Sequence, residues 1–77
     1  MKELLMHILS GLVSKPEAVQ IEEIVKGNNI DYKVKVDSED LGAVIGKGGR
    51  IANSIRTVVR SSAKKQDKRV NVSFDAK

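Results

Sequence analysis

The chain has no cysteine, a single proline and only two aromatic residues, Tyr32 and Phe74. Without cysteine it can form neither a disulfide framework nor a thiolate metal site, and it has no cysteine nucleophile. The scarcity of aromatic rings disfavours nucleic-acid folds that stack bases on rows of such rings. No apolar run approaches the ~20 residues of a membrane span. These absences exclude several classes of protein before any motif is considered.

The amino terminus superficially resembles a signal peptide. Glu3 and His7 interrupt its apolar run, however, and no small-residue cleavage site follows before Pro16. We therefore expect this segment to belong to the fold of a cytoplasmic protein. Val, Ile, Leu and Phe make up about 30% of the 77 residues, above the ~20% below which a chain struggles to bury a core. The length leaves room for one domain, which we expect to span residues 1–77.

The balance of charge is basic. Lys and Arg number 14 and Asp and Glu number 10, which gives a net charge of +4 and a pI near 9.6. A pI above ~9 on so small a domain is typical of a protein that binds a polyanion. Many basic proteins bind nothing acidic, so charge alone leaves both interpretations open.

The first 26 residues predict a helix and then a strand. A helical apolar face comes first, and Pro16 ends the helix by about Lys15. That face consists of Leu5, Ile8, Leu9 and Leu12. Residues 19–26 are rich in β-branched side chains, as a strand is. The adjacent Glu22 and Glu23 break strict alternation, which predicts a bulge or an edge strand.

The rest of the chain predicts a strand, two helices and a last strand. After the turn at 27–29, residues 30–37 alternate between apolar and polar. A short helix with the apolar stripe Leu41, Val44 and Ile45 is expected to be capped by Asp37 or Ser38, with Glu39 and Asp40 near the positive end of its dipole. A second helix should span about 50–64, and residues 69–75 alternate as a strand. The apolar face of the second helix is expected to hold Ile51, Ile55, Val58 and Ser62, with Val59 at the margin.

The predicted order is α-β-β-α-α-β, an α+β fold. Residues 19–26 and 30–37 form an antiparallel hairpin, whereas the two-helix crossover is long enough to place the strands at 30–37 and 69–75 parallel. We expect a three-stranded mixed sheet with the helices packed on one face.

Catalytic and nucleotide-hydrolysing sites are not predicted. His7 is the only histidine and is expected to have a surface or packing role, and no residue set has metal-ligand spacing. The stretch from Gly42 to Gly48 fails as a phosphate-binding P-loop, because three residues rather than four separate its first glycines and Gly48 replaces the magnesium ligand. A dinucleotide fingerprint fails because Ile51 stands at its third glycine. We expect no enzyme activity, no cofactor and no metal.

What remains is a glycine-rich loop between the two helices, Gly46-Lys47-Gly48-Gly49. The free amides and positive dipole at the start of the second helix point into such a loop. Glycines let a phosphodiester backbone approach the main chain, Lys47 and Arg50 add charge, and Ile45 and Ile51 add an apolar wall. The alternative is a flexible connector between helices.

The sequence from Val44 to Ile55, VIGKGGRIANSI, resembles the signature of KH domains, in which Val-Ile-Gly-x-x-Gly is followed by isoleucines. The order of elements resembles the bacterial type II arrangement. The size and the amphipathic first helix resemble the small stand-alone bacterial KH proteins of the KhpA type. This resemblance implies that Gly46, Lys47, Gly48 and Gly49 clamp about four nucleotides of single-stranded RNA.

The resemblance also implies a groove beside the clamp. Its wall would include Ile45, Ile51 and Ile55, with the other side formed by the strand at 30–37. Two further basic sets are candidate phosphate contacts, with a solvated surface as the alternative for each. They are Arg56, Arg60 and Lys64, expected opposite the apolar face of the second helix, and Lys33 and Lys35 on the strand.

By resemblance, the function is that of an RNA chaperone or post-transcriptional regulator. Resemblance further implies a larger Jag-type KH partner and a link to cell-wall and cell-length control. We also expect a homodimer through the glycine loop and the second helix, with Val58 or Val59 at the interface. The alternatives are a dimerisation or adaptor subunit with little RNA binding of its own, and a single-stranded DNA binder.

Overall fold

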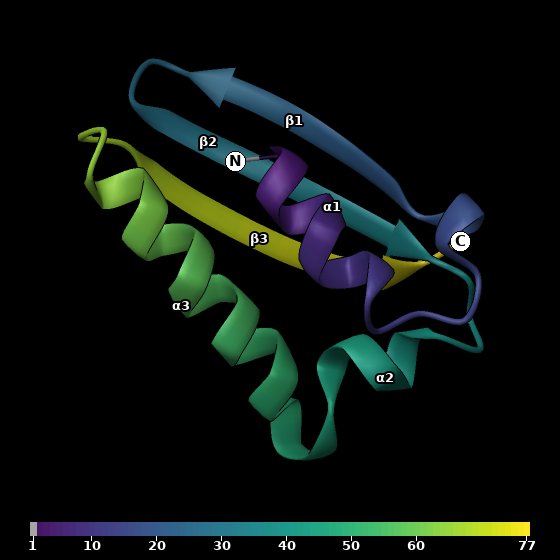
Figure 1. Ribbon diagram of the computed structural model, residues 1–77. Helices are drawn as coiled ribbons and strands as arrows, with labels where there is room; N and C mark the ends of the chain where they lie inside the picture. Colours follow the sequence, from purple (N-terminus) through teal and green to yellow (C-terminus); the bar gives the residue numbers. More distant parts are fainter. Residues whose placement is uncertain (1) are drawn as a thin grey trace.

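The computed structural model describes residues 2–77 and confirms the predicted order of elements (Figure 1). The helices and strands are α1 (Lys2–Ser10), β1 (Gln20–Lys26), β2 (Asn29–Val36), α2 (Leu41–Ile45), α3 (Arg50–Lys64) and β3 (Arg69–Ala76). Two short 3₁₀ turns, Pro16–Ala18 and Lys47–Gly49, precede β1 and α3.

The sheet has the order β1-β2-β3, so β2 is its central strand. β1 and β2 pair antiparallel across a two-residue turn, whose first residue, Gly27, has a φ of 59°. Positive φ at this position suits glycine, which has no Cβ to clash with the backbone. β2 and β3 pair parallel, as expected of strands joined by a two-helix crossover. The sheet is therefore mixed, as predicted.

β1 is an edge strand, but it contains no bulge. Its pairing with β2 runs without interruption from Gln20 opposite Lys35 to Lys26 opposite Asn29. Glu23 lies opposite the buried Tyr32, and the Tyr32 hydroxyl donates a 2.6 Å hydrogen bond to Glu23 Oε2. Burial, followed by the hydrogen bond and charge of Glu23, raises the pKa of Tyr32 to about 12. Of the two predicted alternatives, a bulge or an edge strand, the edge strand is confirmed.

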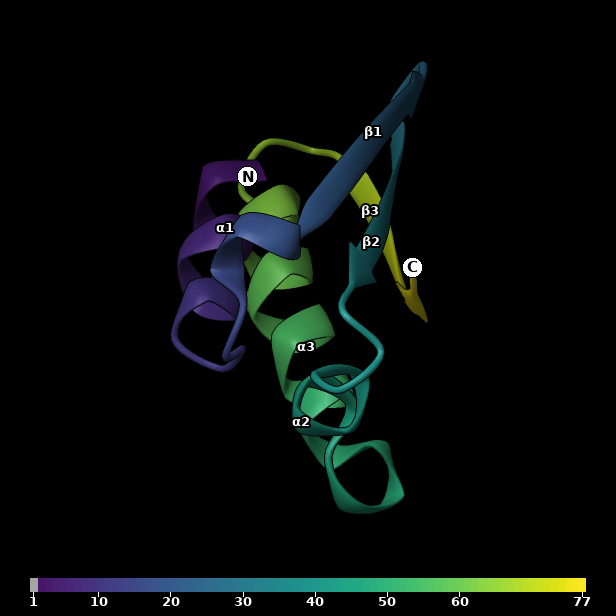
Figure 2. The same ribbon diagram turned by 90° about the vertical axis from the view of Figure 1, so that its right-hand side faces the viewer.

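The core lies between one face of the sheet and the helices, which Figure 2 shows together on that side. Alternate residues of β2 point into it, and Leu5 and Leu9 of α1 are fully buried against them. α1 ends at Ser10, earlier than predicted. The turn that follows begins at Gly11, and Leu12 lies beyond the helix and only half-buried.

The buried face of α3 differs from the predicted one. It consists of Ala52, Ile55, Val59 and Ala63, which follow helical spacing within one narrow stripe. Val59 is at its centre, with no exposed surface, whereas Val58 is 46% exposed and Ile51 is half-buried. The small alanines set the orientation of the helix, and a prediction based on large apolar residues placed Val59 at the margin instead.

Candidate nucleic-acid interface

The loop between α2 and α3 is shaped by three glycines with positive φ. Gly46 ends α2 with φ 73° and ψ 175°, a combination that only glycine adopts readily. Gly48 and Gly49 have φ of 65° and 78° and are left-handed. A Cβ on Gly46 would lie 2.6 Å from Cγ1 of Ile51, whereas a Cβ on Gly48 or Gly49 would meet open space. Gly46 is thus needed for packing and conformation, and the other two for conformation alone.

The loop presents two cationic side chains without an ion-pair partner among residues 2–77, whereas the Gly49 amide donates to the Gly46 carbonyl and the Arg50 amide to the Lys47 carbonyl. Lys47, Gly48 and Arg50 are exposed, and among residues 2–77 no ion pair involves Lys47 or Arg50. Gly49 is the N-cap of α3 and supplies no side chain to the first-turn amides. Such amides carry partial positive charge and attract anions. The loop therefore combines two cations, open main chain and a helix N-terminus.

The predicted apolar wall is only partly accessible. Ile45 and Ile51 are half-buried beside the loop, but Ile55 is 3% exposed and belongs mainly to the core. The strand alongside α2 and α3 is β3, not β2 as predicted. β2 is enclosed between β1 and β3 at the centre of the sheet, so it has no free edge.

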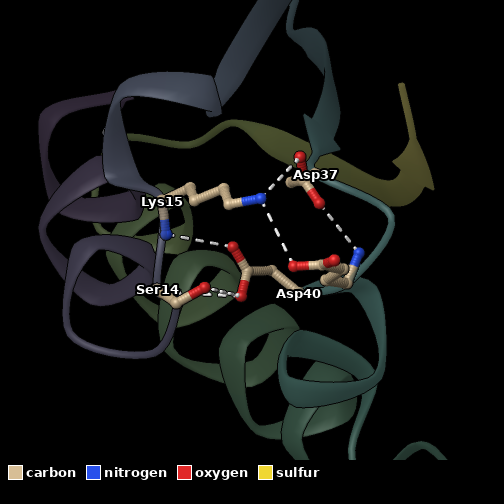
Figure 3. A network of polar contacts seen from close by, with 5 residues as sticks. Ser14, Lys15, Asp37 and Asp40 are labelled. Carbon is tan, nitrogen blue, oxygen red and sulfur yellow. Dashed lines mark hydrogen bonds and ion pairs between the residues drawn. The ribbon is translucent and has the colours of Figure 1, made fainter.

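A polar network supports the segment that leads into α2 (Figure 3). Asp40, 4% exposed, accepts hydrogen bonds from the Ser14 amide at 3.0 Å, the Ser14 hydroxyl at 2.7 Å and the Lys15 amide at 3.1 Å. The Lys15 ammonium lies 3.6 Å from Asp37 and 3.3 Å from Glu39. The hydrogen bonds from Ser14 hold the pKa of Asp40 below its ordinary value.

This network corrects the predicted cap of α2. The N-cap is Asp40, and its side chain makes no capping hydrogen bond because it faces the α1–β1 linker. Asp37 instead accepts a hydrogen bond from the Glu39 amide at 3.0 Å. Sequence reasoning missed the contact between Asp40 and the α1–β1 linker because Ser14 and Lys15 precede Asp40 by 26 and 25 residues. No local pattern distinguishes the buried carboxylate from its exposed neighbours.

The three basic residues of α3 that were predicted as phosphate contacts lie in two different environments. Arg56 is half-buried, and it is not opposite the apolar face: its Nε donates to the Val72 carbonyl at 3.0 Å and its Nη1 to Asn53 Oδ1 at 3.0 Å. Its guanidinium also lies 5.4 Å from the centre of the Phe74 ring. Arg56 therefore fastens α3 to β3. Arg60 and Lys64 are exposed farther along the helix.

Lys33 and Lys35 lie on the opposite side of the molecule from the helices. Both are exposed and alternate with the buried Tyr32, Val34 and Val36 along β2. Side chains alternate across a strand, so the two lysines point away from the face on which α2 and α3 pack.

An apolar groove separates α1 from the start of α3. It has a volume of about 590 Å³ and is lined by Leu4, Ile8, Gly11, Leu12, Arg50, Ile51, Ser54, Ile55 and Val58. Val58 is the exposed apolar residue of α3 in this groove. Of the two predicted interface residues, only Val58 is accessible, because Val59 is fully buried.

The arrangement of the elements now defines the class of protein. A glycine loop joins two helices that cover one face of a three-stranded sheet with a parallel β2–β3 pair, which is the architecture of a type II KH domain. Residues 2–74 match the family model described as KhpA/KhpB, KH domain. The chain belongs to this family, as the motif at 44–55 predicted.

Relatives that match nearly the whole chain support the same family assignment. The chain is 50% identical over 72 residues to the RNA-binding protein KhpA of Clostridium perfringens, covering 94% of this chain and 96% of that protein. It is 49% identical to the protein of that name from Caldanaerobacter subterraneus, with the same coverage. Identity to RNA-binding protein KhpA of Listeria monocytogenes is 43%, over 94% of this chain and 95% of the relative. Among residues 2–77, no helix is long and apolar enough to cross a membrane.

Proposed function

We propose that the chain binds single-stranded RNA by clamping its backbone on the loop at 46–49. The observation that carries this proposal is the loop geometry. Gly48 and Gly49 leave the main chain uncovered, and Lys47 and Arg50 stand beside it without partners among the described residues. Phosphates approach the loop amides and the N-terminus of α3, and the bases lie toward Ile45 and Ile51. The naming of the relatives as RNA-binding proteins supports this function.

The proposed clamp binds weakly and with little sequence preference. It neutralises few phosphates, and each contact adds ~0.7 to the salt dependence of log K on a single strand. Sequence reading needs base-edge contacts or stacking, and neither Tyr32 nor Phe74 offers a stacking surface there. Tyr32 is buried, and Phe74 lies under Arg56.

The direct test replaces Lys47 and Gly48 with aspartate together. Two carboxylates would then face the phosphates, so we expect binding of single-stranded RNA to be lost. The fold should persist, because both residues are exposed and aspartate tolerates the left-handed conformation of Gly48 better than most residues. Fluorescence anisotropy with a labelled oligonucleotide measures the affinity.

The matched control is Lys2→Asp with Gln20→Asp, which makes the same change of charge at two exposed positions away from the loop. This control should lose only the small, general electrostatic part of the affinity. If the loop variant binds RNA as tightly as the control, the clamp is wrongly assigned.

We infer a cellular role from the family. The chain would act in the cytoplasm as an RNA chaperone or post-transcriptional regulator, with a larger Jag-type KH protein as partner and with cell-wall and cell-length control as its context. Crosslinking in cells, followed by sequencing of the bound nucleic acid, identifies the targets. It also distinguishes RNA from single-stranded DNA, whose phosphates the loop would contact equally well.

A second candidate function is that of a dimerisation or adaptor subunit, and the apolar groove beside the loop favours it. A groove of about 590 Å³ with Val58 46% exposed is a surface that a second copy, or a KH partner, would cover. Pairing here would also bring two clamps together and raise avidity. We therefore propose a homodimer or a heteromer through the loop end of α3.

Val58→Asp tests this association. Sedimentation should show a wild-type dimer and a monomeric variant at the same concentration. The control is Val25→Asp, since Val25 is 57% exposed on β1, away from the groove. A wild-type protein that stays monomeric at high micromolar concentration rules out the homodimer, and RNA binding by that monomer rules against the adaptor alternative.

A further inference from the structure

A second cationic surface lies at the other end of α3 from the loop. It is a depression of about 370 Å³ lined by Arg60, Lys64, Lys68, Arg69, Val70 and Asn71, which we call the α3–β3 basic depression. The four cations are all exposed. Arg60 and Lys64 come from α3, Lys68 from the connection and Arg69 from the start of β3, so the fold adds two cations to a pair predicted from the sequence.

The backbone around the depression is well fixed. The Lys68 amide donates to the Ala63 carbonyl at 3.0 Å, which closes the end of α3. The Arg69 amide donates to the Asn28 carbonyl at 2.9 Å, where β3 begins its pairing beside β2. The cations therefore project from positions set by the sheet and the helix.

The charge is concentrated and unpaired. Residues 60–69 contain five cations and one carboxylate, Asp67, so this segment carries +4, as much as the whole chain. Among residues 2–77 the ion pairs all involve Lys15, and none involves this segment. Cations in the last turn stabilise a helix through its dipole. That effect accounts for Lys64 and Lys65, but not for Arg60, Lys68 or Arg69.

The depression is aligned with the loop along one side of α3. Figure 1 shows α3 beside β3, with its first turn at the glycine loop and its last turn near the start of β3. Arg56, Arg60 and Lys64 follow at successive turns, and the 15-residue helix is about 22 Å long. Arg60 is about 200° around the helix from Val58. A partner seated in the apolar groove would therefore leave the depression open.

We propose that the α3–β3 basic depression is a second phosphate-binding surface, which holds the backbone of the RNA strand where it extends beyond the clamp. This inference rests on the proposed RNA binding. The depression adds affinity through charge and reads no bases. It extends the bound strand past the roughly four nucleotides of the loop.

The test compares single-stranded RNAs of 4 and 16 nucleotides. Lys64→Gln with Lys68→Gln removes two charges from the depression, and Lys2→Gln with Lys77→Gln removes two exposed charges elsewhere. The depression variant should bind the 16-mer about tenfold more weakly than the control variant at low salt. Its log K against log salt should be shallower by about 1.4, two contacts at ~0.7 each. Its affinity for the 4-mer should equal that of the control, which also verifies its fold.

NMR amide shifts locate the bound strand. In the wild type the 4-mer should shift Gly46, Gly48 and Gly49, and the 16-mer should shift Lys68 and Arg69 as well. Equal 16-mer affinities for the two glutamine variants overturn the second surface while leaving the clamp intact. If Lys47→Asp with Gly48→Asp keeps full 16-mer affinity and the depression variant loses it, the second surface stands and the clamp is wrong. A wild-type protein that binds neither RNA overturns both.

Discussion

Two short segments lie on either side of α2, residues 37–40 and the loop at 46–49. The acidic side chains of the first have partners within the protein, and the charged side chain of the second has none among residues 2–77. In the first, the carboxylate of Asp40 has three donors from the α1–β1 linker, and Asp37 and Glu39 share the ammonium of Lys15. In the second, the glycines hold the main chain open, and Lys47 has no partner among the described residues. One segment is fixed to the rest of the protein, and the other is left free to bind.

The difference shows how a small domain can combine a rigid support with an available site. Buried polar groups need partners, because an unpaired one costs about 1–3 kcal/mol. Binding groups must instead remain without internal partners until the ligand arrives. Placing five α-helical residues, Leu41–Ile45, between the two segments lets the fixed one position the free one.

The largest expected effect is a loss of stability when a methyl group is added to Gly46. Gly46→Ala should destabilise the fold by about 2–4 kcal/mol, because the new Cβ lies 2.6 Å from Ile51 and the φ of 73° suits only glycine. Gly48→Ala is the comparison, because its φ of 65° and ψ of 19° are left-handed, a milder strain, and its new Cβ meets no clash; it should cost about 1–2 kcal/mol. Urea unfolding measures both. Equal losses would show that the contact with Ile51 is unimportant.

A smaller effect should follow from weakening the support. Asp40→Asn turns one acceptor oxygen into a donor that faces either the amide and hydroxyl of Ser14 or the amide of Lys15, so the melting temperature should fall by several degrees. The RNA affinity of the folded variant should fall as well, if the support positions the loop. Asn53→Asp, at an exposed position of α3, is not a suitable control because it touches Arg56. Ser38→Asn, exposed beside the network, is suitable.

The same variant has a defined dependence on pH. Folding lowers the pKa of Asp40 below its ordinary value of 3.8. The stability that the ionised carboxylate gives to the fold is therefore complete well above pH 3.8 and is lost as the pH falls through the folded pKa. The difference in melting temperature between the wild type and Asp40→Asn should therefore be constant near neutral pH and narrow below about pH 3.8. A difference that stays constant into strong acid would contradict the assigned hydrogen bonds.

The smallest effect is expected at Lys15. Its two ion pairs, at 3.6 and 3.3 Å, lie in partly exposed surroundings, where such pairs contribute about 0–1 kcal/mol. Lys15→Gln keeps the backbone amide that Asp40 needs, so unfolding should change by no more than about 0.5 kcal/mol. Raising the salt concentration should remove even this difference. A loss as large as that of Asp40→Asn would place the main support in the ion pairs instead.

Local patterns in the sequence predicted the elements well. α3 begins at Arg50 and ends at Lys64, within the predicted 50–64, because its start follows a glycine run and its apolar spacing is regular. The mixed sheet was also correctly predicted, since a two-residue turn forces antiparallel strands and a long crossover permits parallel ones. The glycine motif identified the family.

Features that depend on packing were not predicted. The orientation of α3 is set by Ala52 and Ala63, whose small size permits close approach but gives a weak apolar signal. Arg56 was expected to face solvent, and its contact with the Val72 carbonyl depends on the distance between α3 and β3. Asp40 is distinguished from the neighbouring acids only by partners far away in the sequence. Each of these requires knowledge of which segments meet.

The pairing of Glu23 with Tyr32 has a consequence for how copies of the protein can join. β1 is a free edge, and a free edge invites the strands of another molecule to extend the sheet. Glu23 lies on the side of β1 that faces the helices, so an added strand would have to pack beside a carboxylate in that layer. Addition of a further strand at the β1 edge is thereby disfavoured.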